Sequence, residues 1–395
     1  MALAIALVVI VVASVLFHFL SPWWATPLAS NWKQMDDTLT ITLVITGIFF
    51  VVINFFVGYI VWRYRHRAGA RAAYQPENRK LELWLTAGTT LGVIALLAPG
   101  LFVYAEYVRP PANAMVLEVV GQQWQWSFRF PGQGGQLGTS DARFVSAANP
   151  LGVNPDDPRG QDDIIVAGPE VHLPLNRPVK VLLRSKDVLH DFYVPPFRAR
   201  MNMVPGMVTS FWFTPTKTGT YEILCAQLCG VGHYNMRGKV VVEDDAAFQA
   251  WLARQPTFAL TMLKAPAPGA VAGAGGSPAD TLAAQGRALA QSKGCIGCHS
   301  IDGTAGVGPS WKGLYGRTET FADGSSAKVD DGYLKTEITE PQQRLVKGFG
   351  PVMPKIPLSE EEVSALIAYI RANGAQAGGT QAGAPAAAAS GAAAR

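Results

Sequence analysis

Residues 225–236 read CAQLCGVGHYNM and decide the fold of the middle of the chain. Cys225 and Cys229 are four residues apart, His233 follows by four and Met236 by three more. If Cys225 ends a strand and the loop folds back, these side chains converge on one point. Thiolate, imidazole and thioether together favour copper, whereas a structural zinc site uses four cysteines or histidines. The alternatives are a disulfide, which an oxidising compartment permits, or two buried cysteines.

Strand-like runs surround this loop. They are rich in valine and aromatic residues and are separated by glycine and proline, which is typical of an all-β sandwich or barrel. The runs are MVLEVVGQQWQWSFRF (115–130), PVKVLLRSKDVLHDFYVP (178–195), GMVTSFWFTP (206–215), GTYEILCAQL (219–228) and GKVVVED (238–244). His190 lies at another strand end, upstream of Cys225. A distant ligand of this kind fits a cupredoxin-like sandwich and predicts His190 as a further metal ligand.

The N-terminal third of the chain predicts a membrane anchor. Charged residues make up only 16% of the chain, against about 25% in typical soluble domains. Residues 39–62 carry no charge, and 83–105 form a second apolar run. The connector 63–80 holds six Lys or Arg against one acidic residue, Glu77. The positive-inside rule predicts a cytoplasmic connector. All residues after 106 then lie on the outer, periplasmic face of the bacterial inner (cell) membrane.

Residues 2–20 are also apolar, and two interpretations stay open. They form an extra membrane span or a cleaved signal peptide. No Lys or Arg precedes the apolar stretch, which favours a retained span. Retention gives a multi-pass protein with three spans and its N-terminus inside.

A second redox motif, CIGCH, stands at 295–299. Cys-x-x-Cys-His is the attachment signature of c-type haem, with thioethers to Cys295 and Cys298 and iron ligation by His299. From residue 280 onward the only other candidate axial ligand is Met353, because no further His or Met occurs there. A Met opposite a His raises the haem potential and suits electron transfer, whereas the alternative role for Met353 is ordinary packing. This assignment uses all four cysteines of the chain.

Two stretches around this motif are similar to class I cytochromes c. The helix-like SEEEVSALIAYIRA at 359–372 follows the methionine, and GVGPSWKGLYGR at 306–317 resembles the haem-contacting loop of that family. The resemblance implies an all-α cytochrome domain with one covalent haem c. It also implies Pro309 as a haem contact.

Residues 36–250 resemble subunit II of the haem–copper cytochrome c oxidases. The resemblance rests on the apolar hairpin, GQQWQWSFRF (121–130), DVLH (187–190), MVPG (203–206) and CAQLCGVGHYNM. It implies a binuclear copper centre bound by two Cys, two His, one Met and one backbone carbonyl. Carried across, these ligands are His190, Cys225, the carbonyl of Gln227, Cys229, His233 and Met236.

Two further positions follow from this resemblance. The family more often has Glu at 227, whose side chain also holds a magnesium or manganese ion shared with subunit I, so Gln227 puts that ion in question. Trp124 matches the tryptophan at which electrons enter, and its alternative role is a sandwich-core aromatic.

The predicted function is the subunit through which electrons enter a terminal respiratory cytochrome c oxidase. Electrons pass from an external donor, cytochrome c or a cytochrome bc complex, through haem c to the copper centre. They continue to subunit I, which reduces oxygen to water coupled to proton translocation, with subunit III as a further partner. The chain itself carries no catalytic residues, and its net charge of +4 gives no argument for nucleic acid. The alternatives are the input subunit of a nitric-oxide-reducing relative and a membrane-tethered electron carrier.

The predicted fold class is a multidomain membrane protein with a transmembrane helical hairpin, an all-β cupredoxin-like domain and an all-α cytochrome c domain. Its limits are 1–35 for the N-terminal apolar segment, 36–109 for the hairpin, 110–256 for the copper domain, 257–279 for a flexible linker, 280–373 for the cytochrome domain and 374–395 for a disordered Ala/Gly-rich tail.

Overall fold

The structure is a computed structural model that describes residues 2–21, 26–69, 71, 76–146, 148–166, 168–264, 278–304 and 306–375. Most of the predicted linker, 265–277, and most of the predicted tail, 376–395, lie outside the described residues.

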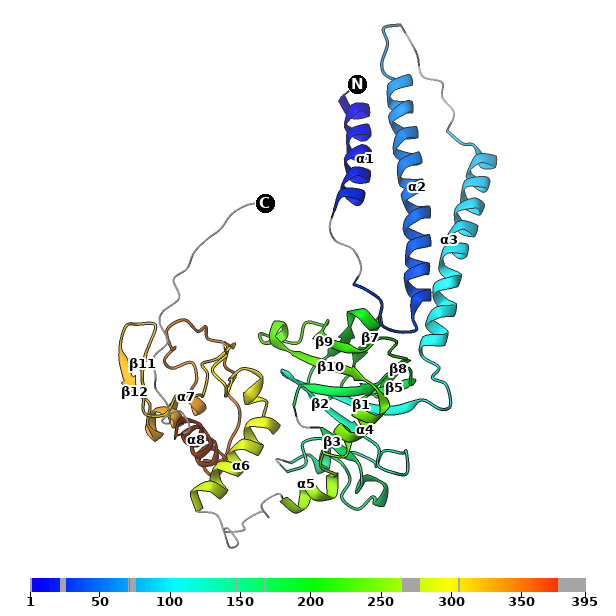
Figure 1. Ribbon diagram of the computed structural model, residues 1–395. Coiled ribbons are helices and arrows are strands. Elements are labelled where there is room, and N and C mark those ends of the chain that lie inside the picture. Colours follow the sequence, from blue (N-terminus) through cyan, green and yellow to red (C-terminus); the bar gives the residue numbers. More distant parts are fainter. Residues whose placement is uncertain are drawn as a thin grey trace.

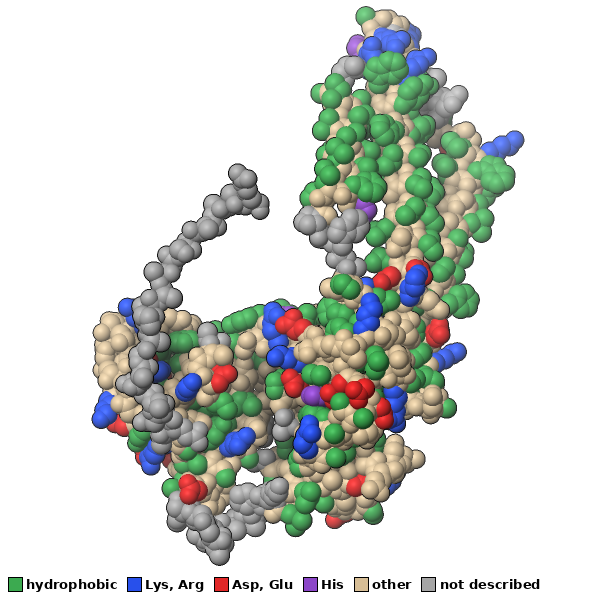
Figure 2. Space-filling view, in the orientation of Figure 1, with side chains coloured by type: hydrophobic (Ala, Val, Ile, Leu, Met, Phe, Trp, Pro, Cys, Tyr) green, Lys and Arg blue, Asp and Glu red, His purple; other side chains and the backbone are tan. Residues whose placement is uncertain are grey.

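Three long apolar helices stand away from the rest of the molecule (Figure 1). They are α1 Ala2–Leu20, α2 Lys33–Arg63 and α3 Arg79–Tyr107, and each is long and apolar enough to cross a membrane. Apolar side chains cover the bundle, and Lys and Arg gather at its tip, where Arg63, Arg65 and Arg67 are exposed (Figure 2). The bundle therefore has an apolar flank and a basic far end, as predicted for a membrane hairpin.

Helix α1 packs along α2 rather than standing free. Ala4 and Val11 are buried on α1, and Gly58 is the buried position of α2. A Cβ at Gly58 would lie 3.8 Å from the carbonyl oxygen of Ala4, so the small residues let the two backbones approach.

An aromatic joint fastens the bundle to the β domain below it. The Trp32 indole donates to the carbonyl of Trp212 at 2.8 Å, and the Trp212 indole donates to the carbonyl of Glu106 at 2.8 Å. Arg198 and Asp36 add an ion pair at 2.6 Å between the β domain and the start of α2. These contacts fix the orientation of the β domain relative to the three long helices.

The middle domain is a sandwich of two five-stranded sheets, as predicted. One sheet has the order β3-β2-β1-β5-β8 and the other β4-β10-β9-β6-β7. The strands are β1 Met115–Gln122, β2 Gln125–Phe130, β3 Ile164–Val166, β4 Glu170–Pro174, β5 Val179–Ser185, β6 His190–Val194, β7 Ala199–Met203, β8 Thr209–Phe213, β9 Gly219–Cys225 and β10 Arg237–Glu243. Apolar side chains from both sheets fill the space between them, including Val181, Phe192, Phe211 and Ile223.

Two of the strand-like runs are each broken in the structure. The run 115–130 is an antiparallel hairpin whose strands pair Gln122 with Gln125, so Trp124 lies in the tight turn. The run 178–195 crosses between the sheets after Ser185, because β5 and β6 belong to different sheets. This crossing brings His190, the first residue of β6, next to the end of β9.

The predicted start of the linker at 257 was too early. Helix α4 Asp245–Leu252 is followed by a second helix, α5 Phe258–Lys264. Phe258 is buried with Val120, Leu151 and Val153, and its amide donates to the carbonyl of Asp163 at 2.7 Å. The burial of one aromatic side chain thus holds residues 258–264 on the copper domain.

The C-terminal domain has a separate core, as expected for an independent cytochrome domain. Its elements are α6 Pro278–Ser292, the 3₁₀ turn η5 Cys295–Gly297, β11 Thr318–Thr320, β12 Ser326–Lys328, α7 Asp331–Thr339 and α8 Glu360–Ala375. Helices α6 and α8 cross where Gly286 leaves room for the backbone of Ala365. Leu289, Trp311 and Leu366 are buried around this crossing.

Candidate metal centres

The structure brings all six predicted copper ligands of the β domain together. The Cys225 Sγ atom lies 3.7 Å from Cys229 Sγ and 3.2 Å from the carbonyl oxygen of Gln227. His190 Nδ1 lies 3.9 Å from Cys225 Sγ, and His233 Nδ1 lies 3.6 Å from Cys229 Sγ. Met236 completes the cluster, with its Sδ 4.0 Å from Cys229 Sγ.

Strand pairing explains why these residues converge. Cys225 ends β9 beside Phe192 of β6, two residues after His190. The amide of Cys225 donates to the carbonyl of Met236 at 3.3 Å, so the hairpin from β9 to β10 closes the ligand loop at its base. Gly121 lies on the facing sheet, and a Cβ at this position would lie 3.2 Å from the His190 ring. The absent side chain leaves room for the imidazole.

The cluster is buried and suited to a soft metal. His190, Cys225, Cys229 and Met236 are all at most 8% exposed, and His233 is half-buried. The neighbouring Cys229 thiol lowers the pKa of Cys225, which favours a thiolate in the pair. Two sulfurs, two imidazoles, a thioether and a carbonyl exceed the four ligands of a closed zinc site and match the soft donors that copper selects.

Asp187 orients the buried His190, a role that was not predicted from the sequence. His190 Nε2 lies 2.8 Å from Asp187 Oδ1, so the hydrogen bond fixes the ring with Nδ1 facing the sulfurs. Asp187 also accepts the amide of Gln123 at 2.7 Å. Its position three residues before His190 was the available signal in the sequence.

Replacing Asp187 by alanine is expected to weaken copper binding about 10–100-fold, the usual cost of losing such an orienting partner. The measurement is competition of the purified protein against a copper chelator of known affinity. Asp156→Ala, at an exposed position between β2 and β3, is the matched control and should leave the affinity unchanged. Equal affinities for the two variants would contradict this role of Asp187.

The CIGCH motif borders a cavity of about 480 Å³ lined by Cys295, Cys298, His299 and Met353. The remaining lining is mostly apolar and includes Val307, Leu345, Phe349 and Leu366. Burial raises the pKa of both cysteine thiols to about 11, which is consistent with a covalent rather than an acid–base role. The cavity chemistry therefore fits a flat apolar cofactor attached through two sulfurs.

The His299 ring is held in one orientation by its neighbours. Its Nδ1 donates to the carbonyl of Pro309 at 2.8 Å, which leaves Nε2 as the free nitrogen of the ring. Trp311 stacks on the ring at a centroid distance of 5.0 Å. A Cβ at Gly308 would lie 2.6 Å from the ring, so glycine is needed there. Burial lowers the pKa of His299, which favours the neutral form that binds metals.

Trp124 connects the hairpin turn to the copper cluster. Its indole donates to the carbonyl of Cys229 at 3.1 Å, and the Gln123 side chain donates to the same oxygen at 2.9 Å. Trp124 is only 8% exposed, and it also lines the cavity of the CIGCH motif. The tryptophan therefore lies between the two candidate centres.

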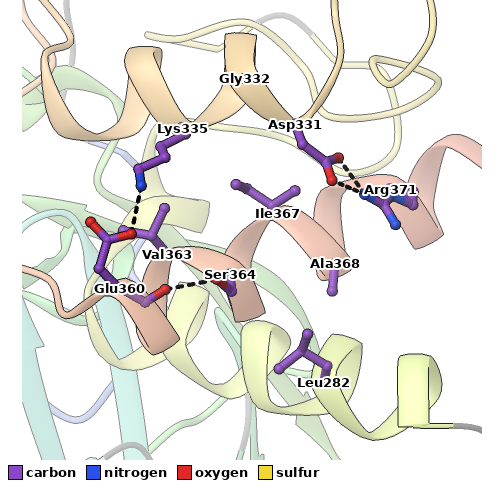
Figure 3. A pocket seen from close by; sticks show the side chains of 10 residues that line it. All are labelled: Leu282, Asp331, Gly332, Lys335, Glu360, Val363, Ser364, Ile367, Ala368 and Arg371. Atoms are coloured by element: carbon purple, nitrogen blue, oxygen red, sulfur yellow. Dashed lines mark hydrogen bonds and ion pairs between the residues drawn. The ribbon is translucent and has the colours of Figure 1, made fainter.

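A second cavity, of about 370 Å³, lies between α6, α7 and α8 (Figure 3). Its charged side chains are paired with each other, Asp331 with Arg371 and Lys335 with Glu360. Between the pairs, Val363, Ile367 and Ala368 form an apolar floor. The residues that line it include no cysteine or histidine, and its paired charged side chains are about half exposed or more.

A buried sulfur–imidazole cluster in a cupredoxin-like sandwich, a c-type cytochrome fold and three membrane-length helices define a membrane-anchored electron-transfer protein. Residues 115–244 match the family described as cytochrome c oxidase subunit II, periplasmic domain, and residues 283–374 match the cytochrome c family. The chain belongs to the cytochrome c oxidase subunit II family and carries a C-terminal cytochrome c domain.

Two curated relatives illustrate this membership. The alternative cytochrome c oxidase subunit 2 of Bradyrhizobium diazoefficiens is 58% identical over 259 residues, 66% of this chain and 94% of the relative. Cytochrome c oxidase subunit 2 of Alkalihalophilus pseudofirmus is 26% identical over 346 residues, 85% of this chain and 86% of the relative. Among solved structures, the periplasmic domain of subunit II from Bradyrhizobium japonicum is 26% identical, covering 37% of this chain and 95% of that chain with a TM-score of 0.27.

Family membership settles the general role. The chain is the subunit through which electrons enter a cytochrome c oxidase, and it works in a complex with subunit I. Copper belongs to the β domain and haem c to the C-terminal domain. The protein is membrane-bound, with its copper domain outside the cytoplasm.

Proposed function

We propose that the six converging side-chain and backbone donors hold two copper ions as one binuclear centre. The observation that carries this proposal is the 3.7 Å separation of Cys225 and Cys229, each with a different imidazole nearest to its sulfur. Cys225 and Cys229 would supply two thiolates and His190 and His233 two imidazoles, enough donors to hold two ions. When bound, the pair shares one electron and changes its geometry little on transfer.

In the C-terminal domain, Cys295 and Cys298 would form the thioether bonds to the haem, and His299 and Met353 would ligate its iron. The shared cavity of these four residues supports the assignment. Pro309 fixes the ligating histidine through its carbonyl. At position 227 the chain offers an amide oxygen in place of a carboxylate, so the proposed cofactors are copper and haem c, and a magnesium or manganese ion would be coordinated more weakly there.

The proposed route begins at an external one-electron donor on the outer face of the bacterial inner membrane, either a cytochrome c or a cytochrome bc complex. The electron reaches haem c, then the copper pair near Trp124, and then subunit I, with subunit III as a further partner. Proposed limits are 110–264 for the copper domain, which includes α5, and 278–375 for the cytochrome domain.

Replacing Met353 by alanine is expected to free one axial position of the haem iron. The haem then changes from a form with two protein ligands to one that binds added ligands such as imidazole, and its reduction potential falls. Absorption spectra with and without imidazole, with a redox titration, measure both effects. Met262→Ala, on α5 of the copper domain, serves as the control. An unchanged spectrum and potential would assign Met353 to packing.

Turnover of the purified complex tests the proposed route. With a soluble c-type cytochrome as donor, we expect oxygen consumption that is lost when copper is removed. Faster turnover with nitric oxide than with oxygen would instead favour the nitric-oxide-reducing alternative. Purification of the chain without any many-span partner would favour a tethered carrier.

A further inference from the structure

The cytochrome domain lies against the copper domain through the loops that carry the proposed ligands of each centre (Figure 1). The side chain of Asn235 donates to the carbonyl of Gly297 at 3.1 Å. Asn235 lies between the copper-loop residues His233 and Met236, and Gly297 lies between the two cysteines of CIGCH. One hydrogen bond therefore joins the two redox loops directly.

The same contact requires glycine on the cytochrome side. A Cβ at Gly297 would lie 3.0 Å from the carbonyl oxygen and 3.1 Å from the nitrogen of Trp124, distances that real side chains rarely tolerate. Gly294, with φ of 77°, similarly faces the carbonyl of Gln123. The absence of side chains lets the CIGCH turn touch the backbone of the Gln123–Trp124 turn.

A second hydrogen bond extends the interface beyond the loops. The side chain of Gln125 donates to the carbonyl of Gln291 at the end of α6. Trp124 is covered in this arrangement and is only 8% exposed. The cavity lined by Cys295 and Cys298 is also lined by Gln122, Gln123 and Trp124, so it extends to the copper domain.

We propose that Asn235 and Gly297 are positioning residues that dock the cytochrome domain for electron transfer within the chain, and that the docked domain closes Trp124 to soluble donors. In this state a soluble donor delivers its electron to haem c. One electron then leaves the ferrous haem, which becomes ferric, and reduces the oxidised copper centre, with no bond or proton exchanged. The inference rests on the proposed function, because it assigns the contact through which that transfer runs.

The energetics make the docking sensitive to single substitutions. A net hydrogen bond changes an equilibrium by about fivefold, so losing the Asn235 donor should lower the ratio of docked to undocked molecules about fivefold. A valine at 297 adds a Cβ and two methyl groups where three Trp124 backbone atoms already lie within 3.3 Å of the Cβ position. We expect the valine to displace the domains more strongly than the loss of the Asn235 hydrogen bond.

The test uses the full-length chain loaded with haem and copper, in complex with its catalytic subunit. Asn235→Leu keeps the size of the side chain but removes the donor, and Gly297→Val removes the backbone contact. Asn235→Gln retains a donor and should restore part of the docking. Gly134→Val is the matched control, because Gly134 has no atom within 4 Å of its Cβ position and lies at an exposed position between β2 and β3.

Two measurements report docking. Photoreduction of haem c followed by its reoxidation gives the rate of internal transfer, and hydrogen exchange of the Gln123–Trp124 turn gives its exposure. In Asn235→Leu and Gly297→Val we expect turn exchange to rise about fivefold or more and internal transfer to slow, with the reduction potentials of both centres unchanged. The two variants lie in different domains. If one of them perturbs its own metal centre, the other variant still tests the docking contact.

Unchanged exchange and unchanged internal transfer in both variants would overturn the docking role. A shift of either reduction potential with no change in exchange would assign Asn235 or Gly297 to the structure of its own loop instead. Failure of the wild-type haem to reduce copper at all would contradict the proposed function rather than the docking contact.

Discussion

Replacing Cys225 by serine is expected to abolish the binuclear copper centre. Its sulfur lies within 3.9 Å of the Gln227 carbonyl, Cys229 and His190, so no other ligand has more neighbours in the cluster. A serine hydroxyl stays protonated and is a poor ligand for soft copper, so copper affinity should fall by more than about 100-fold. Copper analysis and the absorption spectrum of the purified protein measure this loss.

The control for this prediction comes from the other pair of cysteines. Cys295→Ser replaces a cysteine of the C-terminal domain, whose thiol pKa is raised by burial to about 11, and should remove a haem thioether while leaving copper content intact. If Cys225→Ser kept full copper content, or if Cys295→Ser lost it, the assignment of the four cysteines to two separate centres would be wrong.

Replacing Arg129 by methionine is expected to destabilise the copper domain by about 3–5 kcal/mol, the usual cost of leaving a buried charge unpaired. Arg129 is 1% exposed and donates to Glu118 at 2.7 Å and to Asp163 at 2.8 Å. Both carboxylates are also buried, and Glu118 retains only Arg184 in the variant. The thermal unfolding midpoint of the copper domain, followed by its copper absorption, measures the effect.

This destabilisation should depend on pH in a defined direction. Burial raises the pKa of Glu118, but Arg184 and Arg129 outweigh burial and lower it, whereas burial raises the pKa of Asp163 to about 6. Without Arg129 the pKa values of Glu118 and Asp163 in the folded state both rise. Over this pH range the folded variant therefore keeps protons that the unfolded chain has released. Its stability therefore falls as the pH rises above about 4, and the deficit is larger at about pH 8 than at about pH 5.

Arg143→Met is the matched control for the buried pair. Arg143 pairs with Asp141 at 3.0 Å, but its side chain is 81% exposed. Solvent screens such a pair, and little change in the unfolding midpoint is expected. Equal shifts for the Arg129 and Arg143 variants would contradict a structural role of the buried network.

The residues predicted from the sequence as ligands of the two centres are chemically rare types, and the structure brings each set together. Sulfur and imidazole groups at fixed spacing identified His190 and the 225–236 loop, and Cys-x-x-Cys-His identified the haem attachment turn. The apolar runs likewise predicted α2 and α3, because spanning a membrane demands long uncharged segments. Except for the distant His190, these signals are local, so no tertiary structure was needed to interpret them.

The parts that escaped prediction depend on tertiary contacts. The run 115–130 looked continuous, and only strand pairing reveals the turn at Gln123 and Trp124. Phe258 looked like the start of a linker, because its burial against Val120 and Val153 involves distant segments. Asn235 is not one of the predicted ligands of its loop, and its hydrogen-bond partner Gly297 is far along the chain.

The central claim is that one chain carries a binuclear copper centre and a haem c. It is tested most directly by metal and haem analysis of the purified full-length chain combined with a reductive titration. The account predicts two copper atoms and one haem iron per chain, with one electron taken up by the copper pair and one by the haem. One zinc atom per chain, or a single copper that alone takes up an electron, would contradict it.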